Sequence, residues 1–173
     1  MKDFFVYLII GLVYLLSQIF FFDFIKIDNW AHPHIAPLWI LLLPVTINRY
    51  FLYSVSFLFG LALDLTLLPL GLQSLCLMLV STLRYPWMQF ISPQVASLKV
   101  EGSNFQAQSF SWRLLYISPL LGVYAFAYQA LYQFSWIRLS SILIQTVGDW
   151  LFSTVISVLI LLFFYNSDAN KKS

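Results

Sequence analysis

Asp64 is the residue of this sequence whose position most clearly raises a chemical question. It lies in the apolar stretch GLALDLTLLPLGLQ (residues 60–73), and it is the only charged residue between Arg49 and Arg84. A charged side chain at the centre of a bilayer costs roughly 2.5–3.5 kcal/mol on insertion scales, so such a residue usually faces protein or water and has a function. The carboxylate could therefore bind a substrate or an ion, or form a polar contact to a partner helix.

Asp64 also has a structural interpretation. Pro69 and Gly71 can break a helix and turn the chain, and backbone groups freed there could donate hydrogen bonds to the carboxylate at the tip of a helical hairpin. The sequence favours neither interpretation over the other. Ser56 and Gly60 precede Asp64 at four-residue intervals, which predicts a face of small residues that another helix can approach closely.

The remaining titratable and nucleophilic residues give weaker signals. Asp149, in QTVGDWLF, could relay protons, but no His, Lys or Arg is close in sequence, so a polar contact to another helix is favoured. His32 and His34 lie in a segment expected to be a loop, and a catalytic zinc site normally needs three protein ligands. The single cysteine, Cys76, lies in an apolar run and is interpreted as a packing residue.

Three tyrosines recur every four residues within the apolar segment 114–134, which is expected to be a membrane span. Tyr124, Tyr128 and Tyr132 have Gln129 and Gln133 nearby. An aromatic, amide-rich face could line a ligand pocket or bind a partner, although packing within a helical bundle is the default. The motifs HExxH and GxSxG and the phosphate-binding P-loop are absent from the sequence. We therefore expect no enzymatic activity, no cofactor and no metal ion.

The elements that hold these residues are predicted to be membrane-spanning helices. Apolar residues make up 61% of the 173 residues and charged residues only 9%, with a mean hydropathy of +0.83, whereas roughly a quarter of a soluble domain is charged. The sequence thus predicts an all-α integral membrane protein with a single transmembrane domain over residues 1–173. The small net charge of +2 and the lack of a basic arm argue against a nucleic-acid partner.

Six spans are expected. Between Arg49 and Arg84, two helical arms of about 17 residues would each rise about 25 Å, which suits a hairpin with both arginines on one side. Pro37 and Pro44 would kink the second span, unless it begins in the preceding segment. The first span is near the roughly 20 residues needed to cross a bilayer and no cleavage site follows, so it is interpreted as retained. The expected spans are residues 4–22, 35–47, 50–66, 70–84, 114–134 and 142–165.

Orientation follows from the lysines and arginines, which are retained on the cytoplasmic side more often than they are translocated. With six spans and both termini inside, seven of the nine basic residues are cytoplasmic and only Lys26 and Arg138 are outside. Residues 92–113 then form a polar cytoplasmic loop. They follow a segment at 85–93 whose aromatic residues are expected at headgroup depth.

The segment GLALDLTLLPLGLQSLCLMLVSTLR (residues 60–84) resembles the central motif of the MreD family of bacterial rod shape-determining membrane proteins. In that motif an aspartate follows a glycine by four residues, and a short turn, a leucine-glycine pair and an apolar helix ending in a basic residue come next. Gly60, Asp64, Gly71 and Arg84 take these places. Chain length, six spans and cytoplasmic termini agree with the family, whose six-helix architecture is similar to the S components of energy-coupling-factor transporters.

The resemblance implies a non-enzymatic component of the cell-elongation machinery in the bacterial inner membrane. Such a protein binds the single-span protein MreC and acts with MreB, RodZ, RodA and a class B penicillin-binding transpeptidase in lateral peptidoglycan synthesis. The likeness to S components supplies an alternative, a substrate-binding membrane subunit of a vitamin-type transporter. A transporter subunit should contain a pocket of about 300 Å³ or more with convergent polar groups, whereas a scaffold should expose helix faces that a partner covers.

Overall fold

Helices are the only regular secondary structure in the part of the chain that the computed structural model describes. That part consists of residues 2–22, 33–44, 47–65, 71–92, 109–133 and 139–169. The helices are α1 (Lys2–Ser17), which continues as a π-helix η1 (Gln18–Phe22), α2 (Ala36–Leu42), α3 (Arg49–Asp64), α4 (Leu72–Ile91), α6 (Phe110–Gln133) and α7 (Leu139–Ala169). Pro69, His32, Lys26, Arg138 and residues 93–108 of the expected polar loop lie outside the described residues.

Two of the described helices are long and apolar enough to cross a membrane. They are the 24-residue stretches Phe110–Gln133 and Leu139–Leu162, and Tyr7–Phe21 is a shorter apolar helix. These stretches correspond to the fifth, sixth and first of the expected spans. The structure therefore gives an all-helical protein with two candidate membrane spans.

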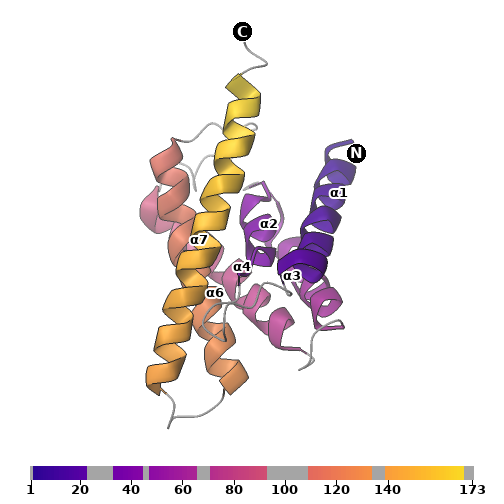
Figure 1. Cartoon of the computed structure of the whole chain (residues 1–173). Coiled ribbons are helices and arrows are strands. Elements are labelled where there is room, and N and C mark those ends of the chain that lie inside the picture. The colour runs from indigo at the N-terminus through magenta and orange to yellow at the C-terminus, as the bar shows by residue number, and fades with distance from the viewer. Residues whose placement is uncertain are drawn as a thin grey trace.

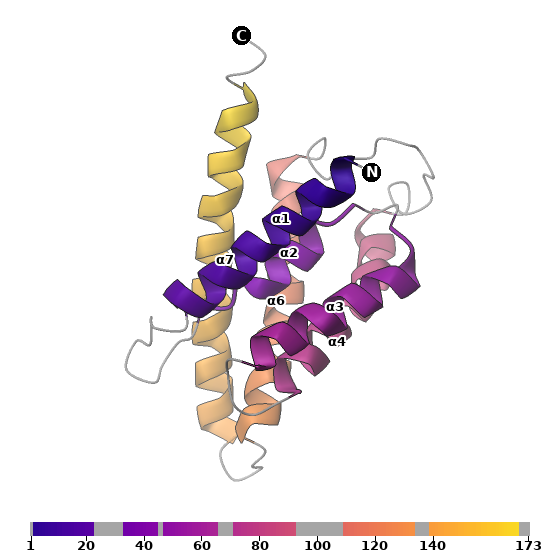
Figure 2. The same ribbon diagram turned by 90° about the vertical axis from the view of Figure 1, so that its right-hand side faces the viewer.

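The helices form two antiparallel hairpins with a short helix between them. One hairpin is α3–α4 and the other is α6–α7, and α4 packs against both α3 and α6. Figure 1 shows α2 near the middle of the bundle, and Figure 2 shows α1 crossing in front of it and α7 projecting beyond the other helices. In both views the N-terminal end of α1 and the C-terminal end of α7 lie toward the same end of the molecule.

Helix α2 is much shorter than the apolar segment 35–47 in which it lies. Its seven residues rise about 10 Å, and its C-cap Leu43 has left the helical region, with ψ at 149°. Pro44 accounts for this end, because a proline disfavours the α conformation in the residue before it. The side chains from Ala36 to Leu41 are all buried, so α2 lies in the core of the bundle.

Helices α4 and α6 extend beyond their expected spans. Helix α4 continues past Arg84 to Ile91, through Pro86, because Arg84 and Met88 one turn later are both buried against the bundle and such packing overrides local propensity. Helix α6 begins at Phe110, within the expected polar loop. The hydroxyl oxygen of Ser109 accepts a hydrogen bond from the Trp112 N–H at 3.4 Å, as the side chain of an N-cap residue does.

The inward face of α7 carries four buried polar residues together with Ile142 and Leu161, and its outward face is largely aliphatic. Large aliphatic side chains are exposed at four-residue intervals: Leu143, Val147, Leu151, Val155 and Leu159. The opposite face buries Thr146, Asp149, Ser153 and Ser157. A surface helix of a water-soluble protein has the reverse arrangement, with its apolar stripe toward the core.

Candidate functional site

Asp64, the last residue of α3, caps the start of α4. Its Oδ1 accepts the Gln73 N–H at 2.9 Å, and its Oδ2 accepts both the Ser74 N–H at 3.0 Å and the Ser74 hydroxyl at 2.6 Å. The first N–H groups of a helix have no partner within the helix, and the N-cap residue of α4 is Gly71, which has no side chain. The fully buried carboxylate of Asp64 supplies the missing acceptors from the other arm of the hairpin, next to the positive end of the helix dipole.

Gly60 lets the two arms meet closely enough for this contact. A Cβ on Gly60 would lie 2.4 Å from Ser74 Cα and 2.7 Å from Ser74 N, so the backbones of α3 and α4 are in direct contact there. Gly71 turns the chain into α4 with φ at +93°, a left-handed conformation that favours glycine. Ser56, one turn before Gly60, is buried and donates its hydroxyl to the Leu52 carbonyl at 2.8 Å.

We call Gly60, Asp64, Gly71, Gln73 and Ser74 the hairpin clasp. The predicted face of small residues meets α4 of the same chain. The contacts of Asp64 are those of the capping interpretation.

Arg84 is a buried cation that caps the C-terminal end of α2. Its Nη1 donates to the Ile40 carbonyl at 3.1 Å, and its Nη2 donates to the Leu43 carbonyl. Its Nε donates to the Tyr116 hydroxyl at 2.8 Å, which connects α4 to α6. The last carbonyls of a helix lack partners within the helix and carry partial negative charge, so a guanidinium satisfies both requirements.

The N-terminal side of α2 is held by two other helices. Gln18 in η1 accepts the Ile35 N–H through Oε1 at 2.9 Å and donates through Nε2 to the Pro33 carbonyl at 3.2 Å. The hydroxyl oxygen of Ser153, in α7, accepts the His34 N–H at 2.9 Å. Side chains from η1, α4 and α7 thus satisfy backbone groups at the two ends of this buried helix.

The tyrosine row of α6 packs around His34. Tyr124 donates its hydroxyl to Gln73 Oε1, which connects α6 to the hairpin clasp. The His34 ring centroid lies 5.2 Å from that of Tyr124, edge to face, and 4.5 Å from that of Tyr128. Tyr132 stacks on Tyr128 at 5.9 Å and is exposed. His34 lies in a non-helical segment just before α2, as expected from the sequence, and it is buried there.

Asp149 belongs to a polar contact between α6 and α7. Gln129 donates to Asp149 Oδ2 at 2.6 Å, and both side chains are buried. Gln133 donates to Gln129 Oε1 at 3.2 Å and to Gln145 Oε1 at 2.5 Å. These contacts match the helix-contact interpretation of Asp149. They lie toward the C-terminal end of α6 and the N-terminal end of α7.

These polar side chains form hydrogen bonds with backbone groups and with one another. Among the residues that the structure describes, no three His, Cys, Asp or Glu side chains are grouped so that they could hold a metal ion. Cys76 is buried and reduced. The chemistry that the clasp and Arg84 perform is hydrogen bonding that fixes helix ends.

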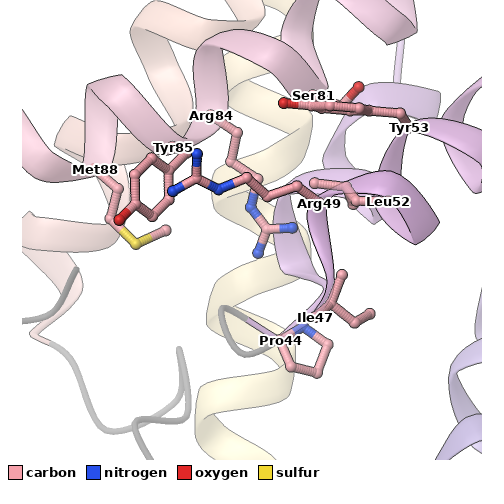
Figure 3. A pocket seen from close by; sticks show the side chains of 9 residues that line it. All are labelled: Pro44, Ile47, Arg49, Leu52, Tyr53, Ser81, Arg84, Tyr85 and Met88. Atoms are coloured by element: carbon pink, nitrogen blue, oxygen red, sulfur yellow. The ribbon is translucent and has the colours of Figure 1, made fainter. Parts of the chain in front are cut away.

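One pocket lies at the end of the α3–α4 hairpin that is remote from the clasp. It measures about 60 Å³. The Arg49 guanidinium lies over the Tyr85 ring, 3.6 Å from its centroid, and Figure 3 shows this pair beside the guanidinium of Arg84. The lining residues are Pro44, Ile47, Arg49, Leu52, Tyr53, Ser81, Arg84, Tyr85 and Met88.

Comparison of the chain with protein-family models, with curated proteins and with solved structures finds no match. The class that the fold and these contacts define is an all-helical protein with two helices able to cross a membrane.

Proposed function

We propose that this chain is a six-span protein of the bacterial inner membrane that serves as a non-enzymatic subunit of the cell-elongation machinery, of the MreD type. Its direct partner is a single-span MreC-like protein, and MreB, RodZ, RodA and a class B penicillin-binding transpeptidase are indirect partners. One observation carries the proposal. The residues Gly60, Asp64, Gly71 and Arg84, on which the resemblance rests, all lie at joints between helices.

The inverted polarity of α7 supports placement in a membrane. Exposed aliphatic residues and buried Asp149, Ser153 and Ser157 are favourable where the surrounding solvent is lipid. The short helix α2 supports it as well, because irregular backbone at membrane depth is tolerated only where protein or a water-filled cavity surrounds it. The common end of the molecule at which α1 begins and α7 ends supports placement of both termini on the same side of the membrane.

The hydrogen bonds that Asp64 and Arg84 form within the chain support the function of a scaffold rather than that of an enzyme. Asp64 accepts three hydrogen bonds from α4, and Arg84 donates to two carbonyls and a hydroxyl. A general acid, base or nucleophile must reach a substrate atom. Both side chains are almost completely buried in contacts of the chain with itself.

The pocket beside Arg49 and Arg84 gives no support to vitamin binding. Its volume of about 60 Å³ is well below the roughly 300 Å³ at which small-molecule pockets begin. The transporter interpretation therefore serves as the contrasting outcome of the test below.

Affinity purification of the tagged full-length chain from its native membranes tests the proposal. We expect recovery of a single-span MreC-like protein at a constant ratio to the bait, with the other elongation proteins at lower levels. A matched bait with Asp64→Leu, which loses the cap of α4, should recover less partner at equal bait amount. Recovery of an ATPase pair together with a bound vitamin would overturn the proposal in favour of transport.

A further inference from the structure

The pocket between α3 and α4 holds positive charge that its walls do not neutralise. Arg49 and Arg84 line it, and none of the nine lining residues is acidic. The Arg84 guanidinium has five N–H groups, and its hydrogen bonds to Tyr116, Ile40 and Leu43 use three of them. One N–H on each Nη atom is left over, and all three acceptors are uncharged.

Arg49 is held in position at the mouth of the pocket. Its side chain is exposed, but the guanidinium stacks on the Tyr85 ring at 3.6 Å. Stacking on an aromatic face leaves the edge of a guanidinium, where its N–H groups point, available for a planar or tetrahedral anion. Figure 3 shows the two guanidinium groups on neighbouring sides of the same space.

We propose that this pocket binds a phosphate group, and that the phosphate is carried by an anionic phospholipid of the surrounding membrane. Two arginines with free N–H groups are the residues that recognise phosphate through paired, charge-assisted hydrogen bonds. The small volume of about 60 Å³ suits one such group and leaves the rest of the ligand outside.

The position of the pocket favours a lipid over a soluble phosphate. Tyr50 is 80% exposed beside Arg49, and Trp87 follows Tyr85 by two residues on α4. Tyrosine and tryptophan collect at the headgroup level of a bilayer. Basic pockets between membrane helices on the cytoplasmic side bind anionic headgroups, and the orientation expected from the basic residues puts Arg49 and Arg84 on that side.

Thermal unfolding of the delipidated full-length protein in a neutral detergent tests the site. The probes are a short-chain phosphatidylglycerol, a phosphatidylcholine of the same chain length, and inorganic phosphate at matched ionic strength. We expect phosphatidylglycerol to raise Tm in a saturable manner at concentrations where the other two have little effect. Arg49→Gln, which removes one charged donor, should weaken this apparent affinity at least about tenfold, and Arg49→Lys should weaken it less.

The control variant is Lys172→Gln, which makes the same change in net charge at a position far from Arg49 and Arg84 in the sequence. Its apparent affinity for phosphatidylglycerol should equal that of the unmodified protein. Equal stabilisation by phosphatidylcholine, or an unchanged response in Arg49→Gln, would overturn the site. If inorganic phosphate saturates the stabilisation as well as the lipid does, the phosphate site is supported and its assignment to a lipid is overturned.

Discussion

Gly60 and Ser74 meet so closely that the Cα of Ser74 lies 2.4 Å from where a side chain on Gly60 would begin. The same serine donates its N–H and its hydroxyl to Asp64. The absence of a side chain at one position and the presence of a carboxylate one turn later are therefore parts of one contact. The hairpin clasp closes only when both conditions are met.

Gly60→Ala should destabilise the protein. The added methyl group would meet backbone atoms of α4, which cannot move without separating the two arms, and such overpacking costs about 1–3 kcal/mol. The control is Gly122→Ala, whose Cβ would lie 3.3 Å from the Trp150 side chain. There the higher helix propensity of alanine offsets the tighter packing. Thermal unfolding in detergent should show a lower Tm for the first variant only, and equal Tm values would contradict the clasp.

Asp64→Leu should remove the cap of α4. It leaves two buried N–H groups without acceptors, and each costs about 1–3 kcal/mol. Asp64→Asn keeps one acceptor oxygen and should cost less, and Ser74→Ala loses only the hydroxyl contact and should cost least. Unfolding midpoints in denaturant should follow this order. A Leu variant with unchanged stability and unchanged recovery of its membrane partner would refute the role of Asp64.

Arg84→Met should release the C-terminal end of α2. The Ile40 and Leu43 carbonyls would lose charged donors, at about 1.5–3 kcal/mol for each hydrogen bond. Arg84→Lys keeps the positive charge but lacks the planar guanidinium that reaches three acceptors at once. It should therefore be more stable than Arg84→Met and less stable than the unmodified protein. Tyr116→Phe, which removes one of these acceptors, is the matched smaller change. Proteolysis in micelles should increase in the order Tyr116→Phe, Arg84→Lys, Arg84→Met.

Gln129→Leu should weaken the pairing of α6 with α7. The variant removes the amide that donates to Asp149 Oδ2, and polar contacts between membrane helices contribute about 1 kcal/mol. Gln145→Ala, which removes only an acceptor at the half-exposed end of the same network, should have a smaller effect. Hydrogen exchange in α6 and α7 is the measurement. Equal exchange rates in the two variants would contradict the prediction that the Asp149 contact stabilises the pairing of α6 with α7.

The local features of the clasp could be read from the sequence because they depend on residues close together in the chain. Ser56, Gly60 and Asp64 share a face through helical periodicity alone, and a glycine after a proline marks the turn into α4. Even so, the sequence left capping and partner contact equally open for Asp64. The choice required the Gln73 and Ser74 N–H groups to be located in space.

The contacts around α2 could not be predicted in the same way. Arg84 reaches carbonyls more than 40 residues earlier, and Ser153 binds the His34 N–H across 119 residues. No periodicity or motif in the sequence predicts such hydrogen bonds, because they depend on how the helices pack. At Pro44 the sequence predicted a kink within a span over residues 35–47, whereas α2 ends at Leu42, directly before the C-cap Leu43.

Helix α2 is synthesised before two of the residues that form hydrogen bonds at its ends. The ribosome produces α2 before α4 supplies Arg84 and before α7 supplies Ser153. Until the last helix has been made, backbone groups at the ends of α2 must be satisfied by water or by temporary partners, because a buried polar group without a hydrogen bond costs free energy. The hydrogen bonds around α2 are therefore completed last, and a chain that stops before α7 lacks the acceptor of the His34 N–H.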